Sequence, residues 1–430
     1  MASTDLAALH ARFLECTGAC TDTRKPLEGG LFFALRGPNF NANNFAAAAL
    51  EAGCRMAVVD DPEVVSDQRF ILVDDVLDTL QELARYHRRQ FDIPVIGITG
   101  SNGKTTTKEL MYAVLSADRP TLATAGNLNN HIGVPLTLLR LNHTYRTAIV
   151  EMGANKVGDI SELVAIAEPT HGLITNIGYA HIEGFGGIEG VLKGKTELYA
   201  WIREHQGRLY VNADDALLME HSAGITRTTY GTNELSEWRG TMKDGRSFLT
   251  FAWEHLGVRS GEVITRLVGA YNLSNALAAV CVGGELGVSD TAMAGAIQSY
   301  EPGNARSQFI DTGRNHLVMD AYNANPTSMK AALEHFAAMP GDRPKMVILG
   351  GMKELGESTA QEHQRLVDLV KELGLDAVYV GREFPPRGDL QIHPDAASAL
   401  AFLEDAAIAE RLILIKGSRG TALEKVLPAL

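Results

Sequence analysis

The chain has 430 residues, of which 45% are hydrophobic and 21% are charged, and its formal net charge is −13. At roughly 100–200 residues per domain, this length predicts two to four globular domains. The acidic balance excludes general binding to nucleic acid, because an acidic surface repels a phosphate backbone. No apolar run approaches the ~20 residues that a membrane helix requires, and no secretory signal opens the sequence, so we expect a cytoplasmic protein without membrane insertion.

The four cysteines, Cys16, Cys20, Cys54 and Cys281, lack the paired spacing of a zinc site. Their small number is typical of a reducing compartment. Cys16 and Cys20 stand four positions apart, a spacing that places two residues on one face of a helix. We therefore expect both to be small, buried, apolar side chains.

Residues 1–90 are predicted to form an α/β domain that binds one substrate. Short apolar runs flank an Ala-rich segment that ends at Gly53, a residue typical of the position after a helix. A further helical pattern leads to Pro94, which interrupts the chain, so we place the first boundary at 90. The expected elements are strands at 29–35 and 55–61 and helices at 44–53 and 79–91.

Residues 91–304 are predicted to form a central α/β domain. Apolar strands alternate with helical patterns here, which predicts a mostly parallel sheet with helices on both faces. Turn residues at 299–308 mark the second boundary, which we place between 304 and 305. The expected elements are strands at 94–100, 146–153 and 171–178 and helices at 104–117 and 272–287.

Residues 305–430 are predicted to form a third, smaller α/β domain. The expected elements are strands at 344–352, 375–381 and 411–418 and helices at 327–338 and 359–374. The same alternation of strand and helix as in the central domain indicates another layered sheet. The predicted fold class of the whole chain is therefore α/β, in three domains.

The clearest motif is GITGSNGKTTTKEL at 97–110. An apolar strand runs into a Gly-rich turn and a helix follows, an arrangement in which backbone N–H groups and a helix N-terminus hold phosphate. Ile98 stands where the longer form of this motif has its first glycine, so the loop is short. We predict a nucleotide site in preference to a plain Gly-rich connection. The predicted phosphate-binding residues are Gly100, Ser101, Asn102, Gly103, Lys104, Thr105 and Thr106.

Two candidate residues follow predicted strands. Glu151 lies at the end of the strand at 146–153, and the carboxyl ends of strands line the ligand crevice of an open α/β sheet. A carboxylate there is a natural Mg²⁺ ligand, although a lone Glu after a strand is more often a solvated loop residue. His181 lies in a Gly-rich loop beyond the strand at 171–178, where a lone histidine is more often structural.

Two helix starts also carry polar candidates. Lys193 and Lys195 are predicted to open a helix, where their charge opposes the helix dipole, so we expect an anionic group to compensate them. Asn272 and Asn275 lie in the first turn of the helix at 272–287. They could cap that helix, or their amides could contact the edge of a nucleotide base.

Ten segments, in this order, resemble those of the Mur ligases. They are TDTR, GGLFFALRGPNFNANNFAAAALEAG, ITGSNGKTTTKE, GNLNNHIGVPLTLL, EMGAN, TNIGYAHIEGFG with KGKTEL, YNLSNALAA, DAYNANPTSM, LGGMKELGE and IKGSRG. They cover essentially the whole chain, and this family uses the short loop Gly-x-x-Gly-Lys-Thr/Ser. The segment DAYNANPTSM, which replaces the Asp-Asn-Pro-Arg motif of a neighbouring branch, is most similar to the branch that adds D-alanyl-D-alanine.

The resemblance implies a fold and a reaction. The fold is an N-terminal module for the UDP part of a substrate, a central P-loop-type ATPase domain, and a C-terminal Rossmann-like domain that receives an amine. The reaction is ATP-dependent ligation of D-alanyl-D-alanine to UDP-N-acetylmuramoyl-tripeptide in peptidoglycan precursor synthesis. ATP phosphorylates the terminal carboxylate, and the amine then displaces phosphate. The expected cofactors are ATP and two Mg²⁺ ions, and the expected state is a monomer.

The resemblance also implies catalytic roles for Lys104, Glu151, His181 and Lys195. Thr105 and Glu151 resemble ligands of one Mg²⁺, and His181 resembles a ligand of the second. Lys195 corresponds to a lysine that is carbamylated in related members. A carbamate would turn this cation into an anion able to support the second ion.

The other implied residues divide between the nucleotide and the remaining substrates. Further ATP-binding candidates are Asn272, Asn275, Arg306 and Asp320. The substrate-binding candidates are Thr23, Arg24, Asn41, Asn129, Asn130, Asn323, Asn325 and Lys416. Two positions depart from the family pattern: Ala305 stands where Gly is often found, and Gly351 stands where Asp is common.

Two alternatives to this hypothesis make different predictions. A folylpolyglutamate-type ligase of the same superfamily would lack the N-terminal module with its FALRG segment. A nucleotide-dependent regulatory protein would hydrolyse ATP slowly without ligating anything. Phosphate release that requires both the UDP-linked peptide and D-alanyl-D-alanine would distinguish the ligase.

Overall fold

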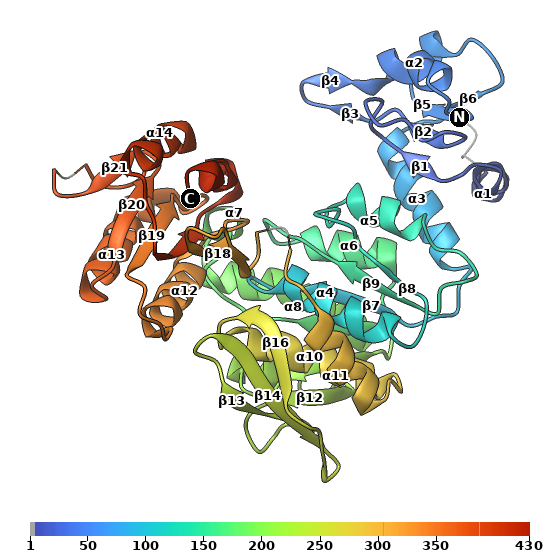
Figure 1. Ribbon diagram of the computed structural model, residues 1–430. Coiled ribbons are helices and arrows are strands. Elements are labelled where there is room, and N and C mark those ends of the chain that lie inside the picture. Colours follow the sequence, from blue (N-terminus) through green and yellow to red (C-terminus); the bar gives the residue numbers. More distant parts are fainter. Residues whose placement is uncertain (1–4, 304, 387) are drawn as a thin grey trace.

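The computed structural model describes residues 5–303, 305–386 and 388–430, which fold into three α/β units that follow one another along the chain (Figure 1). The predicted second boundary falls at residue 304, which lies outside the described residues, as do residues 1–4 and 387. The α/β class is as predicted. Within the described residues, no helix has the length and apolar character needed to cross a membrane.

The N-terminal unit has a parallel sheet in the order β1-β2-β5-β6. Both predicted strands and both predicted helices are present, and Gly53 follows α2 with φ 108°. Its elements are α1 (Leu6–Leu14), β1 (Ala19–Cys20), β2 (Leu31–Phe33), β3 (Arg36–Gly37), β4 (Phe40–Asn41), η1 (Ala42–Phe45), α2 (Ala46–Glu51), β5 (Met56–Val59), η2 (Pro62–Val64), β6 (Phe70–Leu72) and α3 (Val76–Arg88).

The predicted helical pairing of Cys16 and Cys20 is wrong. Helix α1 ends at Leu14, and Cys20 lies in strand β1, with its Sγ 3.8 Å from the Sγ of Cys54. Cys16 and Cys20 are both half-buried. A spacing of four alone does not make a helix when the intervening residues, here Thr-Gly-Ala, favour a turn and an extended strand.

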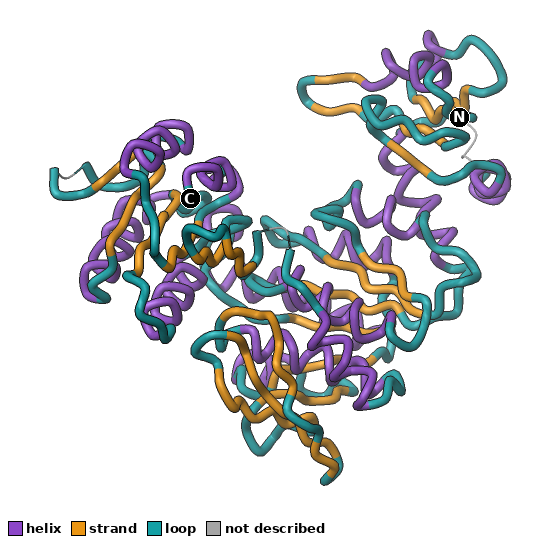
Figure 2. Tube along the Cα trace, viewed as in Figure 1, coloured by secondary structure: helices purple, strands orange, loops and turns teal. Residues whose placement is uncertain are grey.

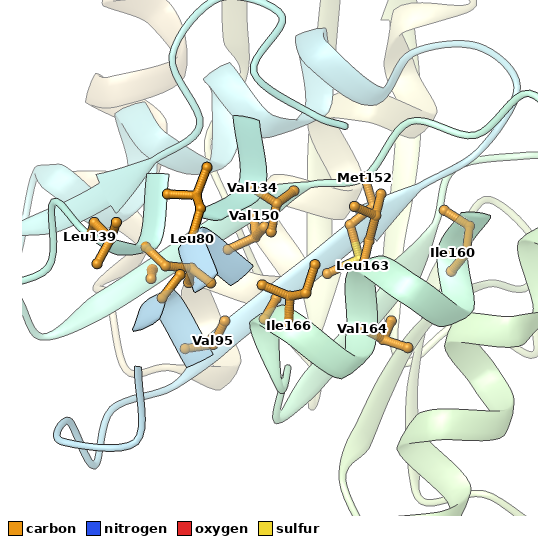
Figure 3. Close-up of a cluster of buried hydrophobic side chains, with 14 of the residues drawn as sticks. Leu80, Val95, Val134, Leu139, Val150, Met152, Ile160, Leu163, Val164 and Ile166 are labelled. Atoms are coloured by element: carbon orange, nitrogen blue, oxygen red, sulfur yellow. The ribbon is translucent and has the colours of Figure 1, made fainter. Parts of the chain in front are cut away.

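Helix α3 joins the N-terminal unit to the central one. Its side chain Leu80 lies in the same buried cluster as Val134 of α5 and Ile166 of α6, which belong to the central unit (Figure 3). The hydrophobic core is therefore continuous across residue 90. The boundary at 90 was predicted from the order of elements along the chain. In the structure, α3 lies before that boundary but packs against both units.

The central unit is built on one large sheet in the order β15-β14-β13-β12-β11-β10-β7-β9-β8, with β16 paired to β14. All predicted strands and helices of this region are present. Its elements are β7 (Val95–Thr99), α4 (Lys104–Ser116), β8 (Thr121–Ala123), α5 (Gly133–Leu138), β9 (Thr147–Glu151), α6 (Asp159–Ala167), β10 (His171–Ile174), α7 (Ile182–Phe185), α8 (Ile188–Glu204), β11 (Arg208–Asn212), α9 (Ala216–His221), β12 (Arg227–Gly231), β13 (Trp238–Asp244), β14 (Phe248–His255), β15 (Val258–Arg259), β16 (Val263–Val268), α10 (Asn272–Glu285) and α11 (Asp290–Ser299).

Helices cover both faces of this sheet, as the alternation of elements predicts. Side chains of α3, α5, α6 and α8 share one buried cluster with Val95 and Val150. Side chains of α4, α10 and α11 share the other cluster with Ile96 and Ile149. Val95 and Ile96 are neighbours in one strand but point to opposite faces of the sheet, and the same holds for Ile149 and Val150. Both faces of the sheet are covered by helices, so both are apolar.

The central sheet is less parallel than predicted. From β8 to β13 the neighbouring strands are parallel, but β14 pairs antiparallel with β13, β15 and β16. These antiparallel strands form the lower extension of the unit in Figure 2. The sequence prediction assigned no strands to residues 205–268, although buried and exposed positions alternate along β16, a pattern typical of a strand with one solvated face.

The C-terminal unit has a sheet in the order β17-β18-β22-β19-β20-β21, parallel except for the pair β17 and β18. Helices α12 and α13 cover one face and α14 the other. All predicted elements of this region are present. Its elements are β17 (Gln308–Asp311), β18 (His316–Asp320), α12 (Pro326–Ala338), β19 (Lys345–Gly350), η3 (Gly356–Ser358), α13 (Thr359–Glu372), β20 (Asp376–Val380), β21 (Gln391–His393), α14 (Ala396–Ala406), β22 (Leu412–Lys416), η4 (Arg419–Thr421) and η5 (Leu423–Ala429).

Candidate active site

A cavity of about 1140 Å³ lies where the carboxyl ends of the central strands meet the C-terminal unit. Its volume exceeds that of a typical pocket for one small ligand, about 300–1,000 Å³. Most of the predicted site residues line it. They are Ser101, Asn102, Gly103, Lys104, Thr105, Thr106, Asn129, Asn130, Glu151, His181, Asn272, Asn275, Arg306, Asp320, Asn323 and Lys416.

The predicted phosphate-binding loop depends on its two glycines. Gly100 has φ 140°, and a Cβ there would lie 2.0 Å from Thr175 Oγ1. Gly103 has φ 80°, and a Cβ there would lie 2.5 Å from Asn275 Oδ1. The loop is therefore held against the end of β10 on one side and against α10 on the other, which only glycine permits.

Lys104 is the first residue of α4, and its ammonium folds back over the loop. Its Nζ donates hydrogen bonds to the backbone oxygens of Gly100 at 2.6 Å and Ser101 at 3.3 Å. Burial lowers the pKa of Lys104 to about 8, an effect that nearby Arg306 adds to and Glu151 opposes. The side chain is thus charged at neutral pH and is positioned to contact an anion bound by the loop.

Glu151 forms a small polar cluster with Thr105. The Thr105 hydroxyl donates to Glu151 Oε1 at 3.1 Å, and Asn129 Nδ2 donates to the same oxygen at 2.8 Å. The other oxygen, Oε2, is buried and has no hydrogen-bond partner among the described residues. A buried, free carboxylate oxygen beside a threonine hydroxyl is a donor set that fits Mg²⁺.

His181 lies against the C-terminal unit. It has φ 54° at the start of α7, and its Nδ1 pairs with Glu354. Burial lowers the pKa of His181, the charges of Lys104 and Lys195 add to this effect, and Glu354 opposes it. A neutral imidazole is the form that binds metal. Among the residues that the structure describes, no three His, Cys, Asp or Glu side chains gather into a metal-binding group.

The prediction that Lys193 and Lys195 open a helix is wrong. Helix α8 begins at Ile188, so both lysines lie inside it and the argument from the helix dipole does not apply. The hydrophobic residues of α8 follow a pattern that starts one turn earlier than the lysine pair. Lys193 is exposed, whereas Lys195 is buried and does not line the cavity.

Lys195 has few polar contacts for a buried lysine. Its Nζ lies 3.4 Å from the backbone oxygen of Ala154 and 5.3 Å from the centre of the Phe185 ring. Burial lowers the pKa of Lys195 well below its ordinary value, and the charge of Lys104 lowers it further. A larger fraction of its amine is therefore neutral and nucleophilic than in an exposed lysine.

Asn272 and Asn275 do not cap helix α10, so the capping alternative is wrong. The cap position is Tyr271, and no side chain caps the helix there. Asn272 Nδ2 donates to the backbone oxygen of Val268 at 2.8 Å, and Asn275 Nδ2 donates to Asn272 Oδ1 at 2.9 Å. Both residues are buried and line the cavity.

The C-terminal unit contributes an ion pair to the cavity. Lys416 Nζ and Asp320 Oδ2 are 2.5 Å apart, and Lys416 also donates to the backbone oxygen of Asn323 at 3.5 Å. The Arg306 guanidinium lies 3.8 Å from the centre of the Tyr322 ring. Cations from both units therefore surround one space.

Of the two departures from the family pattern, Gly351 has a local explanation and Ala305 does not. Ala305 has φ 54°, in the left-handed region that favours glycine. Gly351 lies beside Glu383, and a Cβ at Gly351 would be 2.5 Å from Glu383 Oε2. Glu383 pairs with Lys353, so this carboxylate occupies the space next to Gly351.

Three predicted substrate residues lie in the N-terminal unit and do not line the cavity: Thr23, Arg24 and Asn41. Arg24 pairs with Asp22 at 2.8 Å and is exposed. Asn41 Oδ1 accepts from the backbone N of Asn43 at 3.0 Å at the start of η1. Their role in binding the UDP part stays a prediction.

Sequence reasoning missed two aromatic residues of the cavity, Tyr271 and Tyr322. Tyr271 shares a hydrogen bond of 2.9 Å with Ser307, which also lines the cavity. Both tyrosines stand inside segments that were recognised as motifs, YNLSNALAA and DAYNANPTSM. Each tyrosine directly precedes a predicted site asparagine, Asn272 or Asn323, and this position could have indicated that the tyrosines also line the site.

Two family models match the chain: the Mur ligase middle domain over residues 98–283 and the glutamate ligase domain of Mur ligases over residues 305–419. The UDP-N-acetylmuramoyl-tripeptide–D-alanyl-D-alanine ligase of Synechocystis sp. is 37% identical over 96% of this chain and 91% of its own length. A crystal structure of MurF from Acinetobacter baumannii is 34% identical, has a TM-score of 0.84 and covers 95% of this chain and 92% of that one. MurF ligase from Thermotoga maritima in complex with ADP is 27% identical, with a TM-score of 0.83 and 97% coverage of both chains.

Proposed function

The chain belongs to the Mur ligase family, and we propose that it is the ATP-dependent ligase that joins D-alanyl-D-alanine to a UDP-N-acetylmuramoyl-tripeptide. The observation that carries the type of reaction is the cavity, because it joins the phosphate-binding loop of one unit to the Asp320–Lys416 pair of another. The choice of substrates is supported by a relative of that activity that is similar over 96% of this chain, so the match includes most of the first 90 residues.

The first step activates a carboxylate. An oxygen of the tripeptide's terminal carboxylate attacks the γ-phosphorus of ATP, the bond to the β-phosphate oxygen breaks, and an acyl phosphate and ADP form. Both reactants are anionic, so cations must lie between them. Lys104, which among the described residues donates to two loop carbonyls alone, is placed to donate to the phosphates instead.

Thr105 and Glu151 are the residues that would hold Mg²⁺ near this step. The free Oε2 of Glu151 is the available ligand, while Asn129 holds the other oxygen in place. When bound, the ion would supply positive charge that offsets the repulsion between the γ-phosphate and the carboxylate. His181, as a neutral imidazole, is the candidate ligand of a second ion.

Lys195 is proposed to be carbamylated. A neutral amine adds to CO₂, which forms an N–C bond and releases one proton, and the product is an anion. Burial, which lowers the pKa of Lys195 and so raises the neutral fraction of its amine, favours this reaction. The Lys195 side chain points from α8 toward Ala154, three residues after Glu151. A carbamate on Lys195 would therefore be close to the segment that follows Glu151.

The second step forms the amide. The amine nitrogen of D-alanyl-D-alanine attacks the carbonyl carbon of the acyl phosphate and loses a proton. The tetrahedral intermediate then collapses as the C–O bond to phosphate breaks. Arg306, on the side of the C-terminal unit, is placed to supply positive charge to the departing phosphate. The cytoplasmic location and the monomeric state remain predictions.

An amine screen tests the proposal. Purified protein is given ATP and Mg²⁺ with UDP-muramoyl peptides of different lengths and with D-alanyl-D-alanine, D-alanine, L-lysine or L-glutamate, and phosphate release is followed. We expect release only with the tripeptide and D-alanyl-D-alanine together. With a folate in place of the UDP-linked peptide, release that requires L-glutamate would support the folylpolyglutamate alternative, and release independent of any acceptor would support the regulatory one.

A further inference from the structure

Asn325 differs from the other predicted substrate residues of the C-terminal unit because it does not line the cavity. It is 4% exposed and stands at the N-terminus of α12, where its Oδ1 accepts from the backbone N of Ser328 at 2.9 Å. Its Nδ2 donates to Oδ1 of Asn102 at 2.7 Å. Asn102 belongs to the phosphate-binding loop of the central unit, so this side chain links two units.

Asn102 is itself firmly attached to the central sheet. Its backbone N donates to Asn176 Oδ1 at 3.0 Å, and its backbone oxygen accepts from Asn176 Nδ2 at 3.0 Å and from Thr175 Oγ1 at 2.6 Å. Both partners follow directly after strand β10. The backbone of Asn102 is therefore fixed, and its side chain is the part of the loop that reaches the C-terminal unit.

Cavity residues lie on both sides of Asn325 in the chain. Asn323 precedes it and Thr327 follows it, and both line the cavity. Lys416, which pairs with Asp320, also donates to the backbone oxygen of Asn323. The start of α12 and the Asp320–Lys416 pair therefore form one connected wall, and the position of Asn325 sets the position of that wall relative to the loop.

We propose that Asn325 is a positioning residue that aligns the amine-receiving unit with the phosphate-binding loop. This inference rests on the proposed function, because its effect on rate appears in the ligation reaction. The hydrogen bond to Asn102 holds α12 in register with the loop, and nucleotide that orders the loop also orders the first turn of α12. A misalignment of about 1 Å in a reacting pair can lower a rate by on the order of 100-fold, so a small displacement has a large kinetic effect.

The alternative is that Asn325 only caps α12. The variant Asn325→Ser separates the two roles, because serine caps a helix as well as asparagine but its shorter side chain does not reach Asn102. The matched control is Asp395→Ala. Asp395 caps α14 by accepting from the backbone N of Ser398 at 2.8 Å, and it does not line the cavity.

Steady-state kinetics of the full chain test the rate effect. We expect Asn325→Ser to lower kcat about tenfold and to raise KM for D-alanyl-D-alanine, while the Kd for ADP stays within about twofold. Asp395→Ala should lower the melting temperature and leave kcat unchanged. The double variant Asn102→Ala/Asn325→Ser should be no slower than Asn102→Ala alone, because both changes remove one contact. A wild-type kcat in Asn325→Ser, an equal loss in Asp395→Ala, or additive losses in the double variant would overturn the proposal.

Hydrogen exchange tests the same contact without relying on ligation. We expect ADP to slow amide exchange in the first turn of α12 in the wild-type protein and to leave it unchanged in Asn325→Ser. This result would support the link even if no amine acceptor were found, so a failure of the proposed function would be recognised separately. If ADP does not protect these amides in the wild-type protein, or protects them equally in the variant, the inference is wrong.

Discussion

Lys104 and Lys195 are two desolvated lysines of the central unit whose surroundings differ. Burial lowers the pKa of both, but Glu151 opposes the change at Lys104, which keeps a pKa of about 8. At Lys195 the charge of Lys104 adds to the effect of burial, Asp159 and Glu197 oppose it, and the pKa falls well below the ordinary value. The comparison teaches that burial and the balance of surrounding charges together set how far the pKa of a lysine falls.

Removing the cation should have the largest effect. We expect Lys104→Ala to lower kcat/KM for ligation about 100- to 1000-fold, the range seen when one donor to a developing charge is lost. The measurement is phosphate release at varied ATP concentration with saturating tripeptide and dipeptide, which gives kcat/KM for ATP. Retention of a tenth or more of the wild-type activity, in a variant whose melting temperature is unchanged, would contradict the role of Lys104.

Removing the amine of Lys195 should have the next largest effect. We expect Lys195→Ala to lower kcat about 100-fold, because a ligand that supports a metal ion is lost. The matched control is Lys193→Ala, an exposed lysine two positions away on the same helix, which should keep its activity.

A second readout separates carbamylation from packing at Lys195. In ¹³C-labelled bicarbonate, the wild-type protein should show a carbamate carbon signal that is absent in Lys195→Ala and present in Lys193→Ala. Full activity of Lys195→Ala would end the carbamylation hypothesis. An absent signal in the wild-type protein would do so as well.

Glu151→Gln should bring the pKa of Lys104 closer to that of Lys195. The substitution removes the charge that holds up the pKa of Lys104, so this pKa should fall below 8 and approach the behaviour of Lys195. It also removes the proposed Mg²⁺ ligand, so the Mg²⁺ concentration for half-maximal activity should rise at least about tenfold. An unchanged Mg²⁺ requirement would contradict the assignment of Glu151.

The smallest expected effect is on the pH dependence of nucleotide binding. Lys104 is charged below its pKa of about 8 and neutral above it, and only the charged form attracts phosphate. The affinity for ADP should therefore be constant from pH 6 to 7 and fall above pH 8, by at most about tenfold per pH unit. Carbamate at Lys195 should show the opposite trend and become more abundant as the pH rises, since its formation releases a proton. Calorimetry of ADP binding across this range would contradict the account if the affinity were flat.

Much of the fold could be predicted because its signals are local. The alternation of apolar strands and helices predicted the α/β class, and the Gly-rich turn before Lys104 predicted the loop from adjacent residues. Glu151 was found because it ends a buried strand. The strands between 205 and 268 were missed because one-sided burial along β13 and β16 is a weaker pattern than a fully buried strand.

The contacts between units could not be predicted in this way. Asn102 meets Asn325, and His181 meets Glu354, across more than a hundred intervening residues, and no local pattern marks such pairs. The start of α8 was placed too late because the lysine pair was taken as its first turn, whereas the helix begins at Ile188. Contacts between residues far apart in the sequence depend on how the units pack together, and local sequence patterns do not predict that packing.

The most direct test of the central claim follows an oxygen atom. Tripeptide labelled with ¹⁸O in its terminal carboxylate is ligated to D-alanyl-D-alanine, and the released phosphate is analysed by mass spectrometry. An acyl phosphate carries one carboxylate oxygen in its bond to phosphorus, and that oxygen departs with the phosphate when the amine attacks carbon. The account predicts one ¹⁸O in each phosphate released and a new amide in equal amount. Unlabelled phosphate, or phosphate released without the amide, would contradict it.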